Sequence, residues 1–190
     1  MKFGQFSIAE ADGLVLAHTL KLPERQFCKG HILQAADLLQ IKAAGLSDVT
    51  GVRMEDDDAG EDEAAWMLSQ SIPAEHLRFS DAKTGRVNVY ATVKGVFAVE
   101  KAVVDQFNAI DQAITFACVA DHSRVNSGDM VATFKIIPLA VSRKQLGKAC
   151  ALLCREALRS PAISATCCQP DCNGTAPIEV LRYGQNSAHS

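Results

Sequence analysis

The stretch Thr84-Gly85-Arg86-Val87-Asn88 contains residue types that bind anions. A glycine lets the backbone approach an anion closely, and an arginine side chain holds a phosphate or a carboxylate through two parallel hydrogen bonds. Lys135, further along the chain, is a possible second anion partner. The stretch lacks the glycine spacing and the lysine of a phosphate-binding loop. Two interpretations stay open: a ligand-facing turn that uses Thr84, Gly85, Arg86 and Asn88, or a structural turn with an exposed arginine.

Cysteines crowd into the last quarter of the chain, which holds Cys150, Cys154, Cys167, Cys168 and Cys172. Zinc takes four ligands in a tetrahedron, commonly from two close pairs of residues. Cys150 and Cys154 would share one face of a helix, and Cys168 and Cys172 have the same spacing. That spacing is one residue longer than in the usual C-x2-C pair. The cluster therefore indicates either a zinc site formed by these two pairs or a helix with small apolar cysteines followed by a thiol-bearing tail.

The remaining polar groups favour structural roles. The acidic run at residues 55–63 fails the calcium-loop pattern, because Ala59 and Trp66 stand where oxygen ligands are needed. We interpret the run as a solvated loop and the start of a helix, where carboxylates suit the helix dipole. The five histidines show no metal-binding spacing, and we expect His18, inside an apolar segment, to be a core residue. No G-x-S-x-G nucleophile motif is present.

Short apolar runs and isolated periodic segments predict the α+β class. Apolar residues one turn apart predict helices over 35–44, from about 64 to 72, over 101–110 and from 142 onward. We expect short mixed strands at 3–8, 14–21, 46–52, 87–90, 96–99, 113–120 and 130–141. The spacing of apolar residues becomes irregular after Pro161, so we expect an irregular C-terminal tail. For the whole chain we expect three to four helices and no complete doubly wound domain.

Composition excludes several function classes. The chain has 190 residues, a hydrophobic fraction of 48% and a net charge of -3. Nucleic-acid-binding domains usually carry a basic face, and the chain has no basic run. Neither a signal-peptide pattern nor a membrane-spanning apolar segment is present, so we expect a cytoplasmic protein with reduced thiols.

From Met1 to about Val141, the chain resembles the N-terminal region of bacterial molybdopterin-binding proteins. The resemblance depends on the order of several short stretches, which are Met1-Lys2-Phe3-Gly4, Glu10-Ala11-Asp12-Gly13, Leu16-Ala17-His18-Thr19, Lys29-Gly30-His31-Ile32-Leu33, Ala43-Ala44-Gly45-Leu46, Gly60-Glu61-Asp62-Glu63-Ala64-Ala65, Thr84-Gly85-Arg86-Val87-Asn88 and Met130-Val131-Ala132-Thr133-Phe134-Lys135-Ile136-Ile137-Pro138. Such proteins are related to the molybdopterin molybdotransferases and are often fused to a nucleotidyltransferase domain.

The resemblance implies a role in molybdenum cofactor biosynthesis, with molybdopterin or its nucleotide form as ligand. It gives two parts: residues 1–142 as the family's N-terminal region, and residues 143–190 as a helix with a cysteine-rich tail. The family's pterin-binding domain has no counterpart after Val141, so we expect a truncated or accessory form without a complete active site. A partner chain could supply the missing domain. The cysteine cluster supports the alternative, a small zinc-binding or protein-interaction module.

Overall fold

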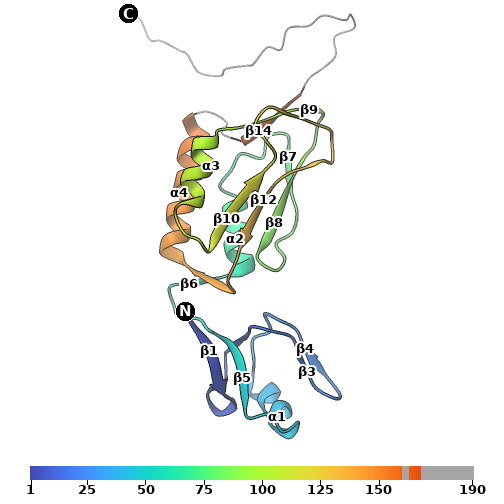
Figure 1. Ribbon diagram of the computed structural model, residues 1–190, viewed down its shortest axis with the longest axis vertical. Helices are drawn as coiled ribbons and strands as arrows, with labels where there is room; N and C mark the ends of the chain where they lie inside the picture. Colours follow the sequence, from blue (N-terminus) through green and yellow to red (C-terminus); the bar gives the residue numbers. More distant parts are fainter. Residues whose placement is uncertain (160–162, 168–190) are drawn as a thin grey trace, which may run out of the picture.

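The computed structural model describes the backbone of residues 1–159 and 163–167, and the side chains of residues 1–155. Two lobes follow each other along the chain (Figure 1). The small lobe is formed by β1 (Lys2–Ser7), the 3-10 helix η1 (Ile8–Glu10), β2 (Val15–Leu16), β3 (Leu20–Lys21), β4 (Gln26–Phe27), α1 (Ala35–Ala43) and β5 (Asp48–Arg53). The large lobe is formed by β6 (Asp58–Gly60), α2 (Glu61–Ser69), β7 (Leu77–Phe79), β8 (Arg86–Ala91), β9 (Gly95–Val99), α3 (Lys101–Asn108), β10 (Ile114–Cys118), β11 (Ser123–Val125), β12 (Met130–Ile136), β13 (Ala140–Ser142), α4 (Arg143–Arg159) and β14 (Ile163–Cys167).

The small lobe is a three-stranded sheet with one helix. Its strands lie in the order β1-β5-β2, and β3 and β4 form a separate hairpin. Ile41 of α1 packs with Leu14, Leu16 and Leu33 in a hydrophobic core that is separate from the core of the large lobe. A capping box begins α1, because the Gln34 side chain and the Asp37 side chain each accept a hydrogen bond from the other residue's backbone amide.

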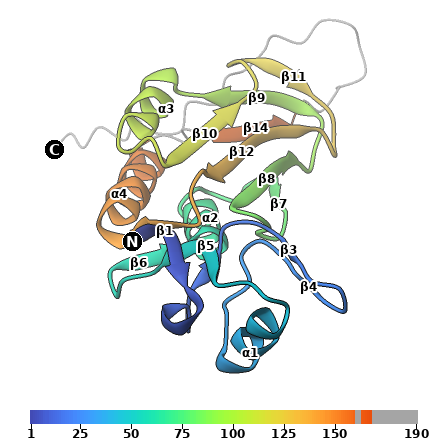
Figure 2. The same cartoon turned by 60° about the horizontal axis from the view of Figure 1, so that its bottom comes forward.

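The large lobe consists of a four-stranded antiparallel sheet with helices on one face. The strand order is β10-β12-β8-β7, and a second sheet has the order β11-β9-β14. α2 packs against β8 and β12, α3 packs against β10, and α4 packs against both α2 and α3. The two views show α3 and α4 side by side on the helical side of the sheet (Figures 1 and 2). Phe107 of α3 meets Phe116 and Phe134 of the sheet in the centre of the core.

The structure confirms the α+β class. Four α-helices lie in the described residues, and the strands pair antiparallel into small open sheets. No helix in the described part of the chain is long and apolar enough to cross a membrane.

The structure changes two details of the expected organisation. Residue 142 does not separate two packing units, because Leu146, Ala149 and Leu153 of α4 belong to the core of the large lobe. The expected irregular tail contains a strand, since β14 pairs with β9 over five positions.

A small apolar contact joins the lobes. Leu139, which precedes β13, packs on Val15, Ala17 and Val52 of the small lobe. The Lys29 ammonium lies 3.4 Å from a Glu61 carboxylate oxygen across the same junction. The Met1 ammonium, next to β1, also lies 2.9 Å from a carboxylate oxygen of Asp58 in β6. The lobes are thus held together by a small apolar contact and by ion pairs of Lys29 with Glu61 and of Met1 with Asp58.

Candidate binding site at the Thr84–Gly85 turn

The predicted turn forms a tight connection between β7 and β8. Lys83 and Arg86 exchange backbone hydrogen bonds of 3.0 and 3.2 Å, so Thr84 and Gly85 are the two residues of the loop. Their φ angles are 51° and 68°. Two successive positive φ values define the turn type that matches the twist of antiparallel strands, and glycine adopts them at the lowest cost.

Gly85 is held by the rest of the large lobe. Its amide donates a hydrogen bond of 2.7 Å to Asp62, and its carbonyl accepts one of 2.7 Å from the Ile136 amide. A Cβ at this position would lie 2.7 Å from the Ile136 carbonyl oxygen. The Gly85 amide therefore already has a protein acceptor, so glycine serves close packing here and not the approach of an anion.

Thr84 is separated from the other candidate residues. Its hydroxyl donates to the Lys83 carbonyl at 2.7 Å, and the residue lines a cleft of about 310 Å³ between the lobes. The cleft also contains Glu61, Asp62 and Glu63, which are bound respectively to Lys29, the Gly85 amide and Arg143. Because its carboxylates are engaged, the cleft is a junction between lobes with little free charge.

Arg86, Asn88 and Lys135 share the open face of the sheet. Lys135 pairs with Arg86 and Thr133 pairs with Asn88 in the register of β12 and β8. Since side chains alternate along a strand, these four point away from the buried face that holds Val87 and Phe134. Arg86 and Lys135 are exposed, whereas Asn88 and Thr133 are half-buried.

The polar residues of this face are connected by hydrogen bonds, and its two cations have no partner among the residues that the structure describes. The Thr133 hydroxyl donates to the side-chain oxygen Oδ1 of Asn88 at 3.0 Å, and the side-chain amide Nδ2 of Asn88 donates to the Tyr90 hydroxyl at 3.4 Å. Among the described residues, neither Arg86 nor Lys135 forms a hydrogen bond or an ion pair through its side chain. Side chains at directly paired positions lie roughly 5 Å apart at Cβ. One anion could therefore contact both cations.

The proposed zinc ligands fall partly outside the described residues. Cys168 and Cys172 lie there, so their position relative to the helix is not described. Cys150 is half-buried and Cys154 is exposed, one turn apart in α4, and the Cys154 thiol lies 3.7 Å from the Ser71 carbonyl oxygen. Burial raises the pKa of the Cys150 thiol, which disfavours the thiolate that binds metal. The described residues hold no group of three or more metal-binding side chains.

An ionic cluster in the small lobe, centred on the buried Asp37, was not predicted from the sequence. His31 Nε2 lies 2.8 Å from an oxygen of the buried Asp37 side chain, and Arg25 lies 3.5 Å from the other oxygen. The hydrogen bond from His31 is the main reason that the pKa of Asp37 is lowered. The spacing of Gln34 and Asp37 could have revealed the capping box. His18, expected in the core, is exposed.

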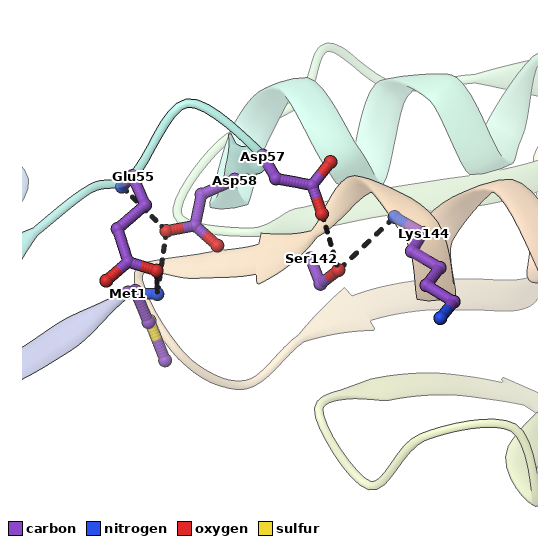
Figure 3. A network of polar contacts seen from close by, with 6 residues as sticks. All are labelled: Met1, Glu55, Asp57, Asp58, Ser142 and Lys144. Atoms are coloured by element: carbon purple, nitrogen blue, oxygen red, sulfur yellow. Dashed lines mark hydrogen bonds and ion pairs between the residues drawn. The ribbon is translucent and has the colours of Figure 1, made fainter.

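The acidic run at residues 55–63 forms polar contacts at the junction of the two lobes. Burial favours the neutral form of Asp58, but the Met1 ammonium at 2.9 Å and the Glu55 amide at 2.9 Å outweigh this effect and lower the pKa of Asp58. Nearby, the Ser142 hydroxyl bonds to Asp57 at 3.4 Å and accepts from the Lys144 amide at 3.2 Å (Figure 3). The run begins α2 as expected, yet Asp58 is buried and not solvated.

Comparison with known protein families gives a match in the small lobe. A family model described as a domain of unknown function (DUF8806) matches residues 5–53. This range runs from β1 to the end of β5. No curated protein and no solved structure matches the chain. The match is confined to the small lobe, and its description names no ligand and no reaction.

Proposed function

We propose that this chain is an accessory protein of molybdenum cofactor biosynthesis that recognises the phosphate group of molybdopterin, or of its nucleotide form, on the open face of its large sheet. Two observations support the proposal. The first is the ordered resemblance of residues 1–141 to the N-terminal region of molybdopterin-binding proteins. The second is the cationic pair of Arg86 and Lys135, which has no side-chain partner in the described part of the chain.

The cationic pair is the observation that carries the proposal. Like charges placed directly opposite each other on paired strands destabilise a sheet. No carboxylate among the described residues compensates this pair. A bound anion would remove the repulsion and gain two charge-assisted contacts. A phosphate suits them, because arginine binds it through a planar fork and lysine binds it as a compact charge.

The neighbouring polar groups fit the rest of such a ligand. Asn88 and Thr133 lie one residue pair further along the same face, and both have donor and acceptor groups. They could contact the amide-like edge of a pterin ring. Gly85 takes no part in this site, and Thr84 faces the cleft instead. The proposal assigns no catalytic step to this chain, so a partner chain would supply the pterin-binding domain.

Calorimetric titration of the purified chain with molybdopterin in its nucleotide form tests the proposal. We expect saturable binding that weakens at least tenfold, or about 1.4 kcal/mol, in Arg86→Ala and in Lys135→Ala. Lys94→Ala removes an exposed lysine from the loop before β9 and should leave the affinity unchanged. Titration with inorganic phosphate shows how much of the affinity comes from the anion alone. Failure of the cofactor to bind, or equal binding by all three variants, would contradict the proposal.

A further inference from the structure

The open face of the large sheet continues beyond the cationic pair and its polar neighbours to a third row of side chains. Tyr90 lies two residues after Asn88 along β8, and it pairs with Met130 of β12 and with Arg78 of β7. Directly paired residues of antiparallel strands point to the same face, and so does every second residue along a strand. The third row therefore lies on the same face as Arg86.

This third row, Arg78 with Tyr90 and Met130, forms an exposed platform of planar and apolar groups. The Cζ atom of Arg78 lies 4.4 Å from the centroid of the Tyr90 ring, so the cation rests on the ring. Arg78 stays exposed, and its guanidinium has no hydrogen-bond or ion-pair partner among the described residues. Met130, on the other side of Tyr90, is 52% exposed. We call these three residues the ring platform, because a planar ring could lie flat on them.

Hydrogen bonds of the polar row hold the ring platform in position. The side-chain amide Nδ2 of Asn88 donates to the Tyr90 hydroxyl at 3.4 Å, and its Oδ1 accepts from the Thr133 hydroxyl at 3.0 Å. The backbone amide of Asn88 donates to the Ser80 hydroxyl at 3.0 Å, which adds a contact with the segment after β7. A surface that is already ordered loses little side-chain freedom when a ligand binds.

The order of the three rows matches the order of groups in a phosphorylated ring compound. Tyr90 is four residues after Arg86, which places the rows roughly 13 Å apart along the strand. A phosphate held by Arg86 and Lys135 would leave its linker over the polar row and its ring over the third row. Guanidinium planes are a common surface for the stacking of nucleobases.

From this order we propose that the open face also binds the planar heteroaromatic ring of its phosphorylated ligand, stacked on the Arg78 guanidinium with Met130 at the edge of the ring. The inference rests on the proposed function, which places the phosphate at Arg86 and Lys135. The ring is a pterin or a nucleobase, since both are planar and heteroaromatic with polar edges. Tyr90 acts as a positioning residue that supports the guanidinium from below.

Calorimetric titration of the full chain with three ligands tests the ring platform. Inorganic phosphate has no ring, adenosine monophosphate has a base without a pterin, and molybdopterin has a pterin without a base. We expect at least one ring-bearing ligand to bind ten times more tightly than phosphate, or better, because one stacked ring contributes a factor of about ten. The ligand that shows this gain identifies the ring that the platform prefers.

Variants of the platform separate stacking from charge. Arg78→Lys keeps the charge and loses the plane, so we expect it to weaken binding of the ring-bearing ligand about tenfold and to leave phosphate binding unchanged. Tyr90→Phe keeps a ring beneath the guanidinium and should retain most of the affinity. Arg124→Ala removes an exposed arginine from β11, in the other sheet, and should change nothing. Circular dichroism checks that each variant is folded.

The outcomes distinguish the ring platform from the anion site at Arg86 and Lys135. Suppose that Arg86→Ala weakens phosphate binding, but the ring-bearing ligands bind no better than phosphate or are bound equally well by Arg78→Lys. The ring platform would then be overturned, and the anion site would stand. Binding of adenosine monophosphate alone, with loss in Arg78→Lys, would support the platform and contradict the pterin as ligand. Failure of all three ligands to bind would overturn both.

Discussion

At the residue scale, the pairing of Arg86 with Lys135 should cost the unliganded protein some stability. Lys135→Gln removes the repulsion and keeps a long polar side chain at the exposed position. We expect it to raise the free energy of unfolding by about 0.3 kcal/mol at low ionic strength. The gain should shrink at high salt, because salt screens exposed charges. Urea denaturation at two salt concentrations measures it, and a loss of stability at low salt would show that Lys135 has a structural partner.

Asp37 should make the stability of the small lobe depend on pH. Its pKa is lowered in the folded protein, chiefly by the hydrogen bond from His31, so its stabilisation is complete above the ordinary value of 3.8. That stabilisation is lost as the pH falls through the lowered value. Asp37→Asn should therefore reduce the free energy of unfolding by about 1 kcal/mol near neutral pH.

The pH series separates this charge effect from a packing effect. Because a protonated aspartic acid is close in size and polarity to asparagine, the two proteins should become equally stable at the acidic end of the series. Denaturation curves of both proteins from neutral pH downward provide the comparison. A difference that stays constant across the series would show that the charge of Asp37 contributes nothing.

At the element scale, the aromatic contacts between α3 and the sheet are expected to dominate the stability of the large lobe. Phe134 is fully buried, and its ring centroid lies 4.7 Å from that of Phe116 and 5.9 Å from that of Phe107. Phe134→Ala should reduce the free energy of unfolding by about 3–5 kcal/mol. Phe3→Ala, at a position that is 65% exposed, is the matched control. Chemical denaturation with similar losses for both variants would refute this assignment of the core.

Helices were the elements most easily predicted from the sequence. The expected helix over 35–44 matches α1, and that over 101–110 matches α3 to within two residues. Spacing of apolar residues suffices for these, because each helix buries one face. The second helix begins three residues before the expected start, since Glu61, Asp62 and Glu63 form its first turn. Acidic residues at this position suit the helix dipole, although they add nothing to the apolar pattern.

Two long apolar runs, each predicted as a single strand, form two strands each. Residues 14–21 form two strands, β2 and β3, because the chain turns outward at the exposed His18 and Thr19. Residues 130–141 also form two strands in different sheets, with Pro138 between them. Hydrophobicity indicates which residues are buried. It does not show where a buried segment stops pairing with one strand and begins to pair with another. β14 was missed because its pairing with β9 depends on residues far away in the sequence.

The candidate site was predicted only in part, for a similar reason. The types of Arg86, Asn88 and Lys135 suggested anion binding, and pairing of β8 with β12 is what brings them together. The role of Gly85 could not be predicted, because its acceptor Asp62 lies 23 residues earlier in the chain. The spacing of residues along the chain identifies groups that are capable of binding. The register of the paired strands decides which of these groups lie next to each other.

At the scale of the whole molecule, the two lobes should open independently. Leu139 is the large lobe's apolar contact with Val15 and Val52. Leu139→Ala should speed amide hydrogen exchange in β2 and β5 and leave exchange in β8 and β12 unchanged, because the lobes have separate cores. Ile137→Ala, at a neighbouring position that is 54% exposed, is the control. Equal acceleration in both lobes would show that they unfold as one unit.

Mapping of amide chemical shifts by NMR, during titration with the nucleotide form of molybdopterin, tests the central claim most directly. We expect the largest shifts at Arg86, Asn88, Thr133 and Lys135, on the open face of the large sheet. Shifts confined to the cleft around Lys29 and Thr84, or no shifts at all, would contradict the assignment of this face as the binding site.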